Sequence, residues 1–320
     1  MPREGLLGID ALTRDEIQAI LDRARDFQPK PNESFGRFEI LKGRTVVNLF
    51  FETSTRTRTS FEIAAKRLGA DAVSITAQAS SVTKGESLVD TLNTLAAMRP
   101  DAIVMRHSAS GAPHFLQRYL ATPIVNAGDG THEHPTQGLL DALTIRDRRG
   151  QLDGCKITII GDILHSRVAR SNIHLLAKFG ALITLCGPAM WLPRELECLA
   201  PNVRRVPVLE DALDGADVIM ALRIQQERIH EPSLPADEYI LRYQLTPARL
   251  RLARPDAIVL HPGPMIRGLE IDPAVADSSQ SCVLEQVTNG LAIRMAILFE
   301  LVAGSSDPQE HVKDSAHASD

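Results

Sequence analysis

Hydroxyl and guanidinium side chains fill positions 54–59 and offer the first chemistry in this sequence. They lie in the stretch NLFFETSTRTRTSFEIAAKRLGAD, residues 48–71, where an apolar run ends and a helical pattern begins. Ser54 or Thr53 is a good N-cap, and the apolar residues at helical spacing that follow lead to Gly69, a natural C′ residue. Residues 54–57 therefore form a first helical turn, whose unpaired N–H groups and positive dipole end suit a phosphate.

The two arginines of this stretch have different expected roles. Arg56 adds a planar fork of donors that matches phosphate oxygens. Arg56 and Arg58 lie about 200° apart around a helix, so they do not serve the same ligand atom in the same way. We assign Arg56 to the ligand and Arg58 to the structure. The plainer alternative is a helix cap followed by solvated arginines.

Polar residues follow the other apolar runs in the same way. We expect strands at 45–51, 72–76, 102–105, 123–126, 156–160, 182–186, 218–222 and 257–260. We expect helices at 13–27, 55–68, 86–98, 113–120, 135–148, 167–179, 191–199 and 287–303. This alternation predicts parallel sheets with helices on both faces. Open parallel sheets bind ligands at the carboxyl ends of their strands, so the polar segments of the two half-chains predict a cleft between two α/β domains.

The polar segment RDRRGQLDGCK, residues 146–156, separates the first group of expected strands from the second. The predicted fold is therefore α/β, with two doubly wound parallel-sheet domains and the active site in the cleft between them. The last residues contain almost no large apolar side chain, which is typical of a flexible tail. The expected parts are a first domain at 1–148, a second domain at 149–286, a C-terminal helix at 287–303 that packs back on the first domain, and a tail at 304–320.

The composition excludes several classes of protein. The net charge of −5 argues against a general nucleic-acid binder, so an anion site must come from local placement of cations. The longest apolar runs are far shorter than a membrane span, and the start MPREGLLGID lacks the apolar core of a secretory signal. The four cysteines are widely spaced. We interpret them as reduced thiols of a cytoplasmic protein, and not as zinc ligands or disulfides.

Several segments together resemble the carbamoyltransferase family. FFETSTRTRTSFEIAAKRLGA resembles its phosphate-binding signature, and NAGDGTHEHPTQGLLDALTI resembles its His-Pro-x-Gln segment. DAIVMRHS, SSVTKGESLVDT, ALRIQQER and LHPGP resemble the aspartate-specific branch. The resemblance implies transfer of a carbamoyl group from carbamoyl phosphate to L-aspartate, which gives N-carbamoyl-L-aspartate and phosphate. In the family this is the second step of de novo pyrimidine (UMP) biosynthesis.

The resemblance also implies roles for residues of the first half. The phosphate would be held by Ser54, Thr55, Arg56 and Thr57. Arg106, His134 and Thr57 would face the carbonyl oxygen, and Gln137 would bind the carbamoyl amide. Lys84 would lie in the active site in contact with both substrates. A serine of the same loop would contact the phosphate, and the sequence leaves open whether it is Ser80 or Ser81.

Acyl transfer needs preorganised donors for the developing oxyanion and cations for the leaving phosphate. It requires no metal, no cofactor and no Ser-His-Asp set. His134 precedes Pro135 at a helix entrance, where the positive dipole favours a neutral imidazole, and a neutral ring still donates one hydrogen bond. The departing phosphate, with a second pKa of about 6, is a candidate acceptor for the proton of the amine, beside solvent or a side-chain base. His107 and His132 are interpreted as bystanders.

For the second half, the resemblance places Arg167 on one carboxylate of aspartate, and Arg223 with Gln225 on the other. Arg167 follows Gly161-Asp162, but the segment lacks G-x-G-x-x-G, so we reject a dinucleotide site. The stiff turn 262–264 offers a backbone carbonyl that can accept from the amine. We count Gly263 and Pro264 with the carbamoyl phosphate site. His-Pro-Gly-Pro departs from the His-Pro-Leu-Pro of some relatives, so this contact depends on backbone shape.

Three alternatives remain. An ornithine or related amino-acid carbamoyltransferase shares the first-domain motifs, but it would show a Ser-Met segment and His-Cys-Leu-Pro where Arg223 and His261 stand. A non-catalytic assembly paralogue would have lost Arg56, Lys84 or His134, and all are present. A Rossmann dehydrogenase is more distant. The resemblance further implies a homotrimer with sites shared between chains and a larger assembly with a regulatory chain or a dihydroorotase-type partner, and neither nucleic acid nor a membrane as partner.

Overall fold

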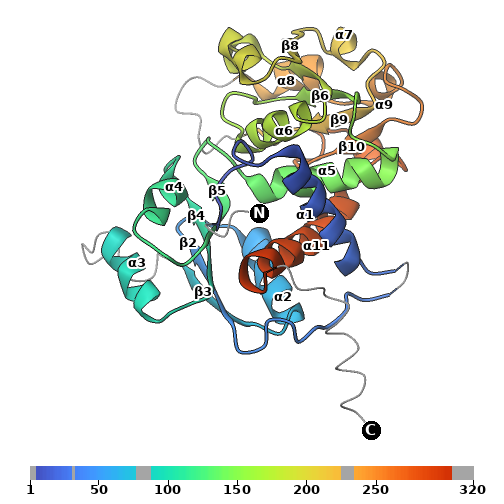
Figure 1. Ribbon diagram of the computed structural model, residues 1–320. Coiled ribbons are helices and arrows are strands. Elements are labelled where there is room, and N and C mark those ends of the chain that lie inside the picture. Colours follow the sequence, from blue (N-terminus) through green and yellow to red (C-terminus); the bar gives the residue numbers. More distant parts are fainter. Residues whose placement is uncertain (1–4, 31–32, 77–87, 225–233, 305–320) are drawn as a thin grey trace. The chain divides into compact units, whose positions relative to one another are not determined.

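The computed structural model describes residues 5–30, 33–76, 88–224 and 234–304. The chain forms two compact units, one made of Met1–Thr136 with Thr288–Asp320 and the other of Gln137–Val287. Each unit holds a five-stranded sheet whose paired strands are all parallel (Figure 1). The predicted fold class, α/β with two doubly wound parallel sheets, is therefore confirmed.

The first unit has the strand order β1-β5-β4-β2-β3. Its strands are β1 (Gly5–Leu6), β2 (Thr45–Phe50), β3 (Asp71–Thr76), β4 (Ala102–His107) and β5 (Ile124–Asp129). Its helices are α1 (Arg14–Phe27), α2 (Thr55–Arg67), α3 (Leu88–Ala97) and α4 (Ala112–Gln117). The unit also contains the start of α5 (Pro135–Arg149) and most of α11 (Val283–Val302).

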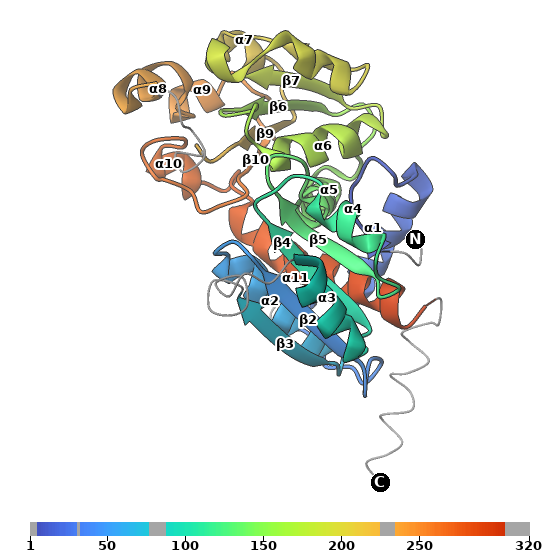
Figure 2. The same cartoon turned by 90° about the vertical axis from the view of Figure 1, so that its left-hand side faces the viewer.

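Helices cover both faces of this first sheet. Alternate residues of β2, Val47 and Leu49, pack in one cluster with Leu92 and Leu95 of α3, and α3 and α4 lie in front of the sheet in Figure 2. Among the other helices, α11 contacts α1 through Phe299 and Phe27, and it contacts α2 where Arg294 lies over the ring of Phe61. α1 and α11 run side by side in Figures 1 and 2. Between them the rings of Phe27 and Phe299 pack edge to face, with their centroids 5.9 Å apart. This two-sided burial follows from the period of two along a strand.

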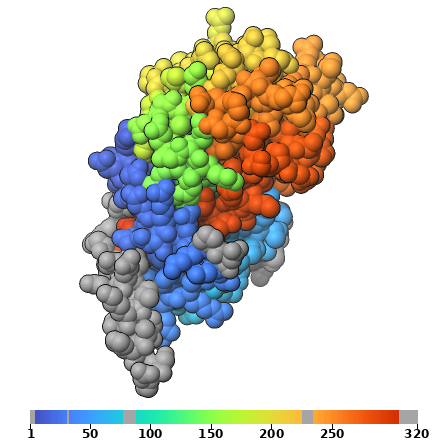
Figure 3. All heavy atoms as spheres, turned by 90° about the vertical axis from the view of Figure 1, so that its right-hand side faces the viewer, coloured from blue at the N-terminus to red at the C-terminus, as the bar shows by residue number. Residues whose placement is uncertain are grey.

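Local signals fix the ends of α1 and α2. Thr13 and Glu16 form a capping box at the start of α1. Dark blue atoms, the colour of the first part of the chain, form part of the surface in Figure 3. Ser54 is the N-cap of α2, as one of the two predicted candidates, although its side chain makes no capping hydrogen bond. Gly69 follows α2 with a φ of +87°, the left-handed conformation that glycine adopts at this position.

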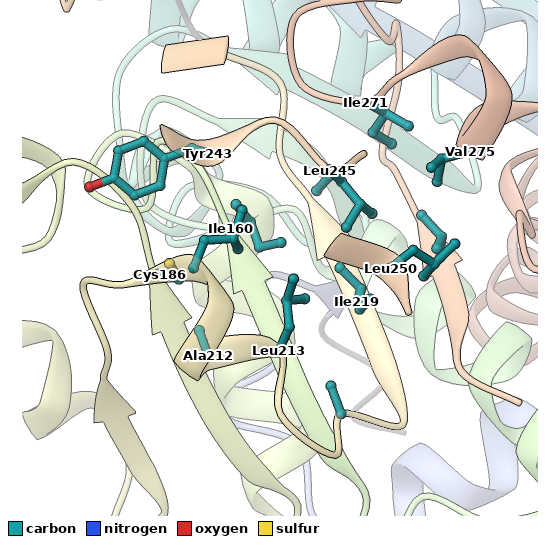
Figure 4. Close-up of a cluster of buried hydrophobic side chains, with 14 of the residues drawn as sticks. Ile160, Cys186, Ala212, Leu213, Ile219, Tyr243, Leu245, Leu250, Ile271 and Val275 are labelled. Carbon is teal, nitrogen blue, oxygen red and sulfur yellow. The ribbon is translucent and has the colours of Figure 1, made fainter. Parts of the chain in front are cut away.

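The second unit has the strand order β10-β9-β6-β7-β8. Its strands are β6 (Lys156–Ile160), β7 (Leu182–Cys186), β8 (Val203–Arg205), β9 (Val218–Ala221) and β10 (Ile258–Leu260). Its complete helices are α6 (Arg167–Ala177), α7 (Leu209–Leu213), α8 (Ala236–Tyr243), α9 (Pro247–Leu250) and α10 (Pro273–Ala276). Figure 4 shows the apolar cluster under α7, α8 and α9, in which Ile160 and Ile219 of the sheet meet Leu213, Tyr243 and Leu250.

The structure differs from the expected elements in several places. The helix expected at 191–199 is wrong: two short 3₁₀ turns, Ala189–Trp191 and Arg194–Leu199, stand there. Pro193 lies between them and cannot donate a backbone hydrogen bond, so it interrupts the helix. The final helix begins at Val283 instead of 287. The short strands β1 and β8 and the helices α7 to α10 were not expected, because their patterns span too few residues to show a period.

No helix within the described ranges is both long enough and apolar enough to cross a membrane. All four cysteines lie in the described part of the chain and are free thiols; Cys198 is exposed, and Cys155, Cys186 and Cys282 are buried. Burial raises the pKa of the Cys282 thiol to about 11 and that of the Cys186 thiol to about 12. Those two thiols are therefore protonated and unreactive near neutral pH.

Candidate active site

The first sheet changes direction between β2 and β4. From β2 the chain passes to β3 on one side, and then crosses back to β4 on the other side of β2. The crevice outside the carboxyl ends of two such strands is where open α/β sheets bind ligands. Phe50 of β2 pairs with Arg106 of β4, so α2, which follows β2, and Arg106 lie at the same edge of this sheet.

The N-terminus of α2 has the features of an anion site. Its first turn contains no acidic residue, and the N-cap Ser54 makes no side-chain capping hydrogen bond to the backbone N–H groups of that turn. Thr55 and Arg56 are exposed, whereas Thr57 is buried. The positive end of the helix dipole is therefore not neutralised by the helix itself.

A cavity of about 280 Å³ opens beside this turn. Its walls are Phe50, Phe51, Glu52, Thr53, Ser54, Thr55, Arg58 and Thr76. The half-buried Arg58 lines this cavity, and Arg56 does not. The assignment of Arg56 to the ligand and Arg58 to the structure stays a prediction. Since Arg58 is the arginine that lines the cavity, the kinetic effects of replacing each arginine have to be compared.

Arg106 is half-buried at the end of β4 and is paired with an acid that sequence reasoning missed. Its Nε donates to Oε2 of Glu52 over 3.0 Å, and both side chains are less than one-fifth exposed. Glu52 therefore competes with any anion for this guanidinium. The signal was present in the sequence, because Glu52 is the acid that stands between the apolar run and the hydroxyl-rich turn.

The third strand end of this edge, after β5, carries His134. The imidazole is 5% exposed, and its Nδ1 lies 3.4 Å from Oγ1 of Thr136. The neighbouring Glu133 is buried and accepts the backbone N–H of Ile9 with both carboxylate oxygens, at 3.1 and 2.9 Å. This contact ties the loop before α5 to the segment after β1. Because β5, β4 and β2 are neighbours, the donors at positions 54–57, 106 and 134 share one sheet edge.

One group of side chains within the described ranges could hold a metal ion. His114, Asp129 and His132 each place a ligand atom within 4.8 Å of the others. However, Asn126 and the N–H of Glu133 donate to Oδ1 of Asp129. Its Oδ2 accepts from the N–H of Gly111 and lies 3.0 Å from Nδ1 of His132.

These contacts explain the ionisation of Asp129. Burial raises the pKa of this carboxyl, but the hydrogen bonds from His132, Asn126 and Gly111 outweigh burial and hold the pKa below its usual range. Both oxygens of Asp129 already accept hydrogen bonds from the protein. We therefore interpret His114, Asp129 and His132 as residues that hold the loop before His134 in place, and not as a metal centre.

The second sheet has its own change of direction, between β6 and β9. Arg167 follows β6 as the first residue of α6 and is 4% exposed. The N-cap Ser166 accepts the N–H of Ala169 over 3.1 Å, which fixes the start of this helix. Arg223 follows β9, where Leu222 donates to the carbonyl of Ile160 over 2.8 Å. Both arginines thus lie at the ligand-binding edge of this sheet.

A buried acid lies near Arg223. Burial raises the pKa of Glu270, and the charge of Arg223 acts in the opposite direction. Oε1 of Glu270 accepts the N–H of Ile224 over 3.2 Å, and Oε2 accepts the N–H of Ile266 over 2.7 Å. Glu270 therefore fixes the backbone that follows Arg223 and the segment after the 261–264 turn.

The turn at 261–264 and Gln137 complete the predicted residues that the structure describes. Gly263 has a φ of +62°, a left-handed conformation that favours glycine, and Pro264 is exposed. Gln137 is 8% exposed on α5. Ser80, Ser81, Lys84 and Gln225 lie outside the described residues.

The fold and these strand ends define a class of protein: α/β, with cationic and hydroxyl donors gathered at the switch point of each sheet. Comparison with known families identifies the class further. Residues 5–147 match the model of the aspartate/ornithine carbamoyltransferase, carbamoyl-P binding domain, and residues 153–301 match that of the Asp/Orn binding domain. The chain belongs to the aspartate/ornithine carbamoyltransferase family.

Individual relatives agree with this assignment. The aspartate carbamoyltransferase catalytic subunit of Solibacter usitatus is 67% identical over 93% of this chain and 99% of its own length. That of Syntrophotalea carbinolica is 54% identical over 97% of each chain. The aspartate transcarbamoylase of Trypanosoma cruzi in complex with N-(phosphonacetyl)-L-aspartic acid aligns with a TM-score of 0.85 and 33% identity, over 93% of this chain and 95% of the other.

An ornithine enzyme shares the same fold. The ornithine carbamoyltransferase of Pyrococcus furiosus aligns with a TM-score of 0.82 and 28% identity, over 95% of this chain and 98% of the other. Fold alone therefore does not select the amino-acid substrate.

Proposed function

We propose that this chain is the catalytic chain of an aspartate carbamoyltransferase. It transfers the carbamoyl group of carbamoyl phosphate to the α-amine of L-aspartate, with release of phosphate. The observation that carries the proposal is the shared edge of the first sheet, where the start of α2, Arg106 and His134 follow three neighbouring strands. The highly identical relatives named above bear this activity in their names.

Carbamoyl phosphate binds at the first sheet in this proposal. The phosphate lies on the first turn of α2, held by Ser54, Thr55, Arg56 and Thr57, because helix N–H groups and a guanidinium both stabilise phosphate charge. Ser80 or Ser81 and Lys84 add further contacts. Thr57, Arg106 and His134 donate to the carbonyl oxygen, on which negative charge grows as the amine attacks. Gln137 accepts from the carbamoyl amide.

Aspartate is held by the second sheet. Arg167 binds one carboxylate, and Arg223 with Gln225 binds the other, because two arginines on neighbouring strand ends match a dicarboxylate. Gly263 and Pro264 present backbone to the carbamoyl phosphate site, and a carbonyl of this turn can accept from the amine. The departing phosphate accepts the amine proton.

The same proposal assigns the domains. Residues 1–148 bind carbamoyl phosphate, residues 149–286 bind aspartate, and the helix at 287–303 belongs with the first domain. The tail expected at 304–320 lies, except for Gly304, outside the described residues. The limits of the two family models, 5–147 and 153–301, support the division near residue 150. The cleft expected between the domains stays a prediction.

Assembly and location complete the proposal. The name "catalytic subunit" of the relatives supports an oligomer, which we propose to be a homotrimer with shared sites. It can join a larger assembly with a regulatory chain or a dihydroorotase-type partner. Free thiols at all four cysteines are consistent with a reducing, cytoplasmic compartment. The product, N-carbamoyl-L-aspartate, places the reaction in pyrimidine biosynthesis.

The test is an assay of the purified protein with carbamoyl phosphate and either L-aspartate or L-ornithine. Phosphate release and carbamoylated product should appear together with aspartate, and N-(phosphonacetyl)-L-aspartate should inhibit the reaction. Turnover with ornithine in place of aspartate would assign the chain to the other branch of the family. Absence of turnover with either amino acid would contradict an enzymatic role.

A further inference from the structure

A buried carboxylate on α5 gathers the side-chain amides of three different segments. Asp141 is 2% exposed. Its Oδ1 accepts from Nε2 of Gln137 over 2.9 Å and from Nε2 of Gln286 over 2.7 Å, and its Oδ2 accepts from Nδ2 of Asn172 over 2.7 Å. All four residues belong to the second unit. Asp141 was not among the residues singled out from the sequence.

These contacts determine which way each amide faces. The oxygen and nitrogen of an amide are told apart by the hydrogen bonds that they make, and an ionised carboxylate only accepts. Gln137 must therefore turn its NH₂ group toward Asp141. Its Oε1 consequently lies on the other side of the planar amide, available to an N–H donor.

The same carboxylate acts on the turn that follows β10. Gln286 gives its NH₂ group to Asp141, so its Oε1 is free to accept the backbone N–H of His261, which it does over 2.9 Å. Nδ1 of His261 accepts the N–H of Gly263 over 2.8 Å. A chain of hydrogen bonds thus runs from Asp141 to the 261–264 turn.

The third amide connects the carboxylate to α6. Asn172 lies on this helix, which begins at Arg167, and its Nδ2 also donates to the carbonyl of Val168 over 3.1 Å. Its Oδ1 is buried and has no hydrogen-bond partner in the described part of the chain. Reversal of the Asn172 amide therefore gives up no contact of Oδ1, although it gives up the bond from Nδ2 to the carbonyl of Val168.

We propose that Asp141 is a positioning residue for the carbamoyl group: it orients the amide of Gln137 so that Oε1 accepts from the carbamoyl NH₂, and through Gln286 it sets the 261–264 turn. The inference rests on the proposed function, in which Gln137 binds this amide. An apolar side chain would fill the same space, but it would leave the amides of Gln137 and Gln286 without an acceptor and without a fixed orientation.

The role requires an acceptor at Oδ1 and not a charge as such. In Asp141→Asn, the new NH₂ group can face Asn172 once that amide reverses, and the remaining oxygen still accepts from Gln137 and Gln286. In Asp141→Leu no acceptor remains. The two variants therefore separate orientation of the amide from loss of the charge.

The experiment measures kcat and KM for carbamoyl phosphate in a double-mutant cycle of Asp141→Leu and Gln137→Ala. Asp141→Leu alone should lower kcat/KM by about tenfold or more. In the Gln137→Ala background it should cost clearly less, because only the path through Gln286 to the 261–264 turn remains to be lost. Asp141→Asn should stay within about threefold of the wild type. As a matched control, Asn172→Leu removes the amide on the other oxygen, and its KM for carbamoyl phosphate should not change.

Several outcomes would overturn the inference. Losses that multiply fully in the double variant would show that Asp141 does not act through Gln137. A folded Asp141→Leu protein with wild-type carbamoyl phosphate kinetics would remove it from the site altogether. If Asp141→Leu does not fold, a loss above about tenfold in folded Asp141→Asn would still contradict amide orientation as its task. Failure of the proposed function is distinct, because the wild-type protein itself would then form no carbamoyl aspartate.

Discussion

Nε of Arg106 and Oε2 of Glu52 lie 3.0 Å apart at the carboxyl ends of two adjacent strands, with both side chains less than one-fifth exposed. The pair places an acid beside the arginine that is proposed to stabilise the carbonyl oxygen. A partly buried pair of this kind holds the guanidinium in one orientation. Loss of one partner leaves the charge of the other unpaired and only partly solvated. Its structural and catalytic roles can be separated.

Arg106→Ala should lower kcat by about 10²–10³-fold, because one donor to the oxyanion is lost. It should also lower the free energy of unfolding by about 1–3 kcal/mol, because Glu52 loses this cation. Adding Glu52→Gln to Arg106→Ala should restore stability but not turnover. Urea unfolding and steady-state kinetics measure the two effects. Recovery of turnover in the double variant would show that Arg106 serves only to neutralise Glu52.

Arg56→Ala and Arg58→Ala form a matched pair on one helix turn. If Arg56 stabilises charge on the leaving phosphate, its removal should lower kcat by about 10²–10³-fold while the fold persists. Arg58→Ala should have the smaller kinetic effect. Parallel assays and circular dichroism of both variants decide the matter. Because Arg58 lines the cavity beside α2, the reverse ranking would transfer the phosphate role to Arg58.

Arg223→Ala should raise the KM for aspartate and leave that for carbamoyl phosphate nearly unchanged. A charge-assisted contact with a carboxylate contributes about 1.5–3 kcal/mol, which corresponds to roughly tenfold to a hundredfold in KM. The exposed Arg251 provides a control, and Arg251→Ala should alter neither constant. Equal increases for both substrates in Arg223→Ala would argue that the residue supports the fold and not the aspartate site.

The sequence was sufficient for features that depend on local pattern. The strand-to-helix turn at 48–57 and the end of α2 at Gly69 were predictable, because cap residues and helical spacing act over a few residues. The strands 156–160 and 182–186 were located to the residue, because both are short apolar runs bounded by turn signals.

The sequence was insufficient where contacts join distant residues. Asp141 meets Gln286 and Asn172 across 145 and 31 positions, and no periodicity encodes the direction of an amide. Glu52 pairs with Arg106 across 54 positions. The sequence shows that Glu52 stands in a donor-rich segment, but it does not show that Arg106 is its partner. Such polar contacts depend on the register of the sheet, which only the assembled fold supplies.

Subunit complementation tests the predicted sharing of sites. Arg56→Ala and Lys84→Ala should each be nearly inactive, and mixtures that exchange subunits should regain activity if Lys84 serves the site of a neighbouring chain. Random one-to-one assembly of trimers gives about three-quarters mixed trimers, each with one intact site in three, so about a quarter of the wild-type activity should return. No recovery, with exchange verified by a mass-tagged chain, would place Lys84 with its own chain or outside the site.

Asp141 binds its proton more tightly in the folded protein than an exposed carboxyl does. Burial raises the pKa of this carboxyl to about 6, although the hydrogen bonds from Asn172, Gln286 and Gln137 act in the opposite direction. Its usual value is 3.8. Because the folded protein holds the proton more tightly than the unfolded chain, the contribution of Asp141 to stability is greatest below about pH 4 and is lost as the pH rises toward and through 6. The loss amounts to about 3 kcal/mol.

Asp141→Asn cannot titrate, so its free energy of unfolding should rise relative to that of the wild type by about 2 kcal/mol between pH 4 and pH 7. Urea unfolding at pH steps across this range measures the difference. A constant offset between Asp141→Asn and the wild type would mean that Asp141 has the same pKa in the folded and unfolded chains. A relative decrease between pH 4 and pH 7 would mean that the three amides stabilise the carboxylate by more than burial costs.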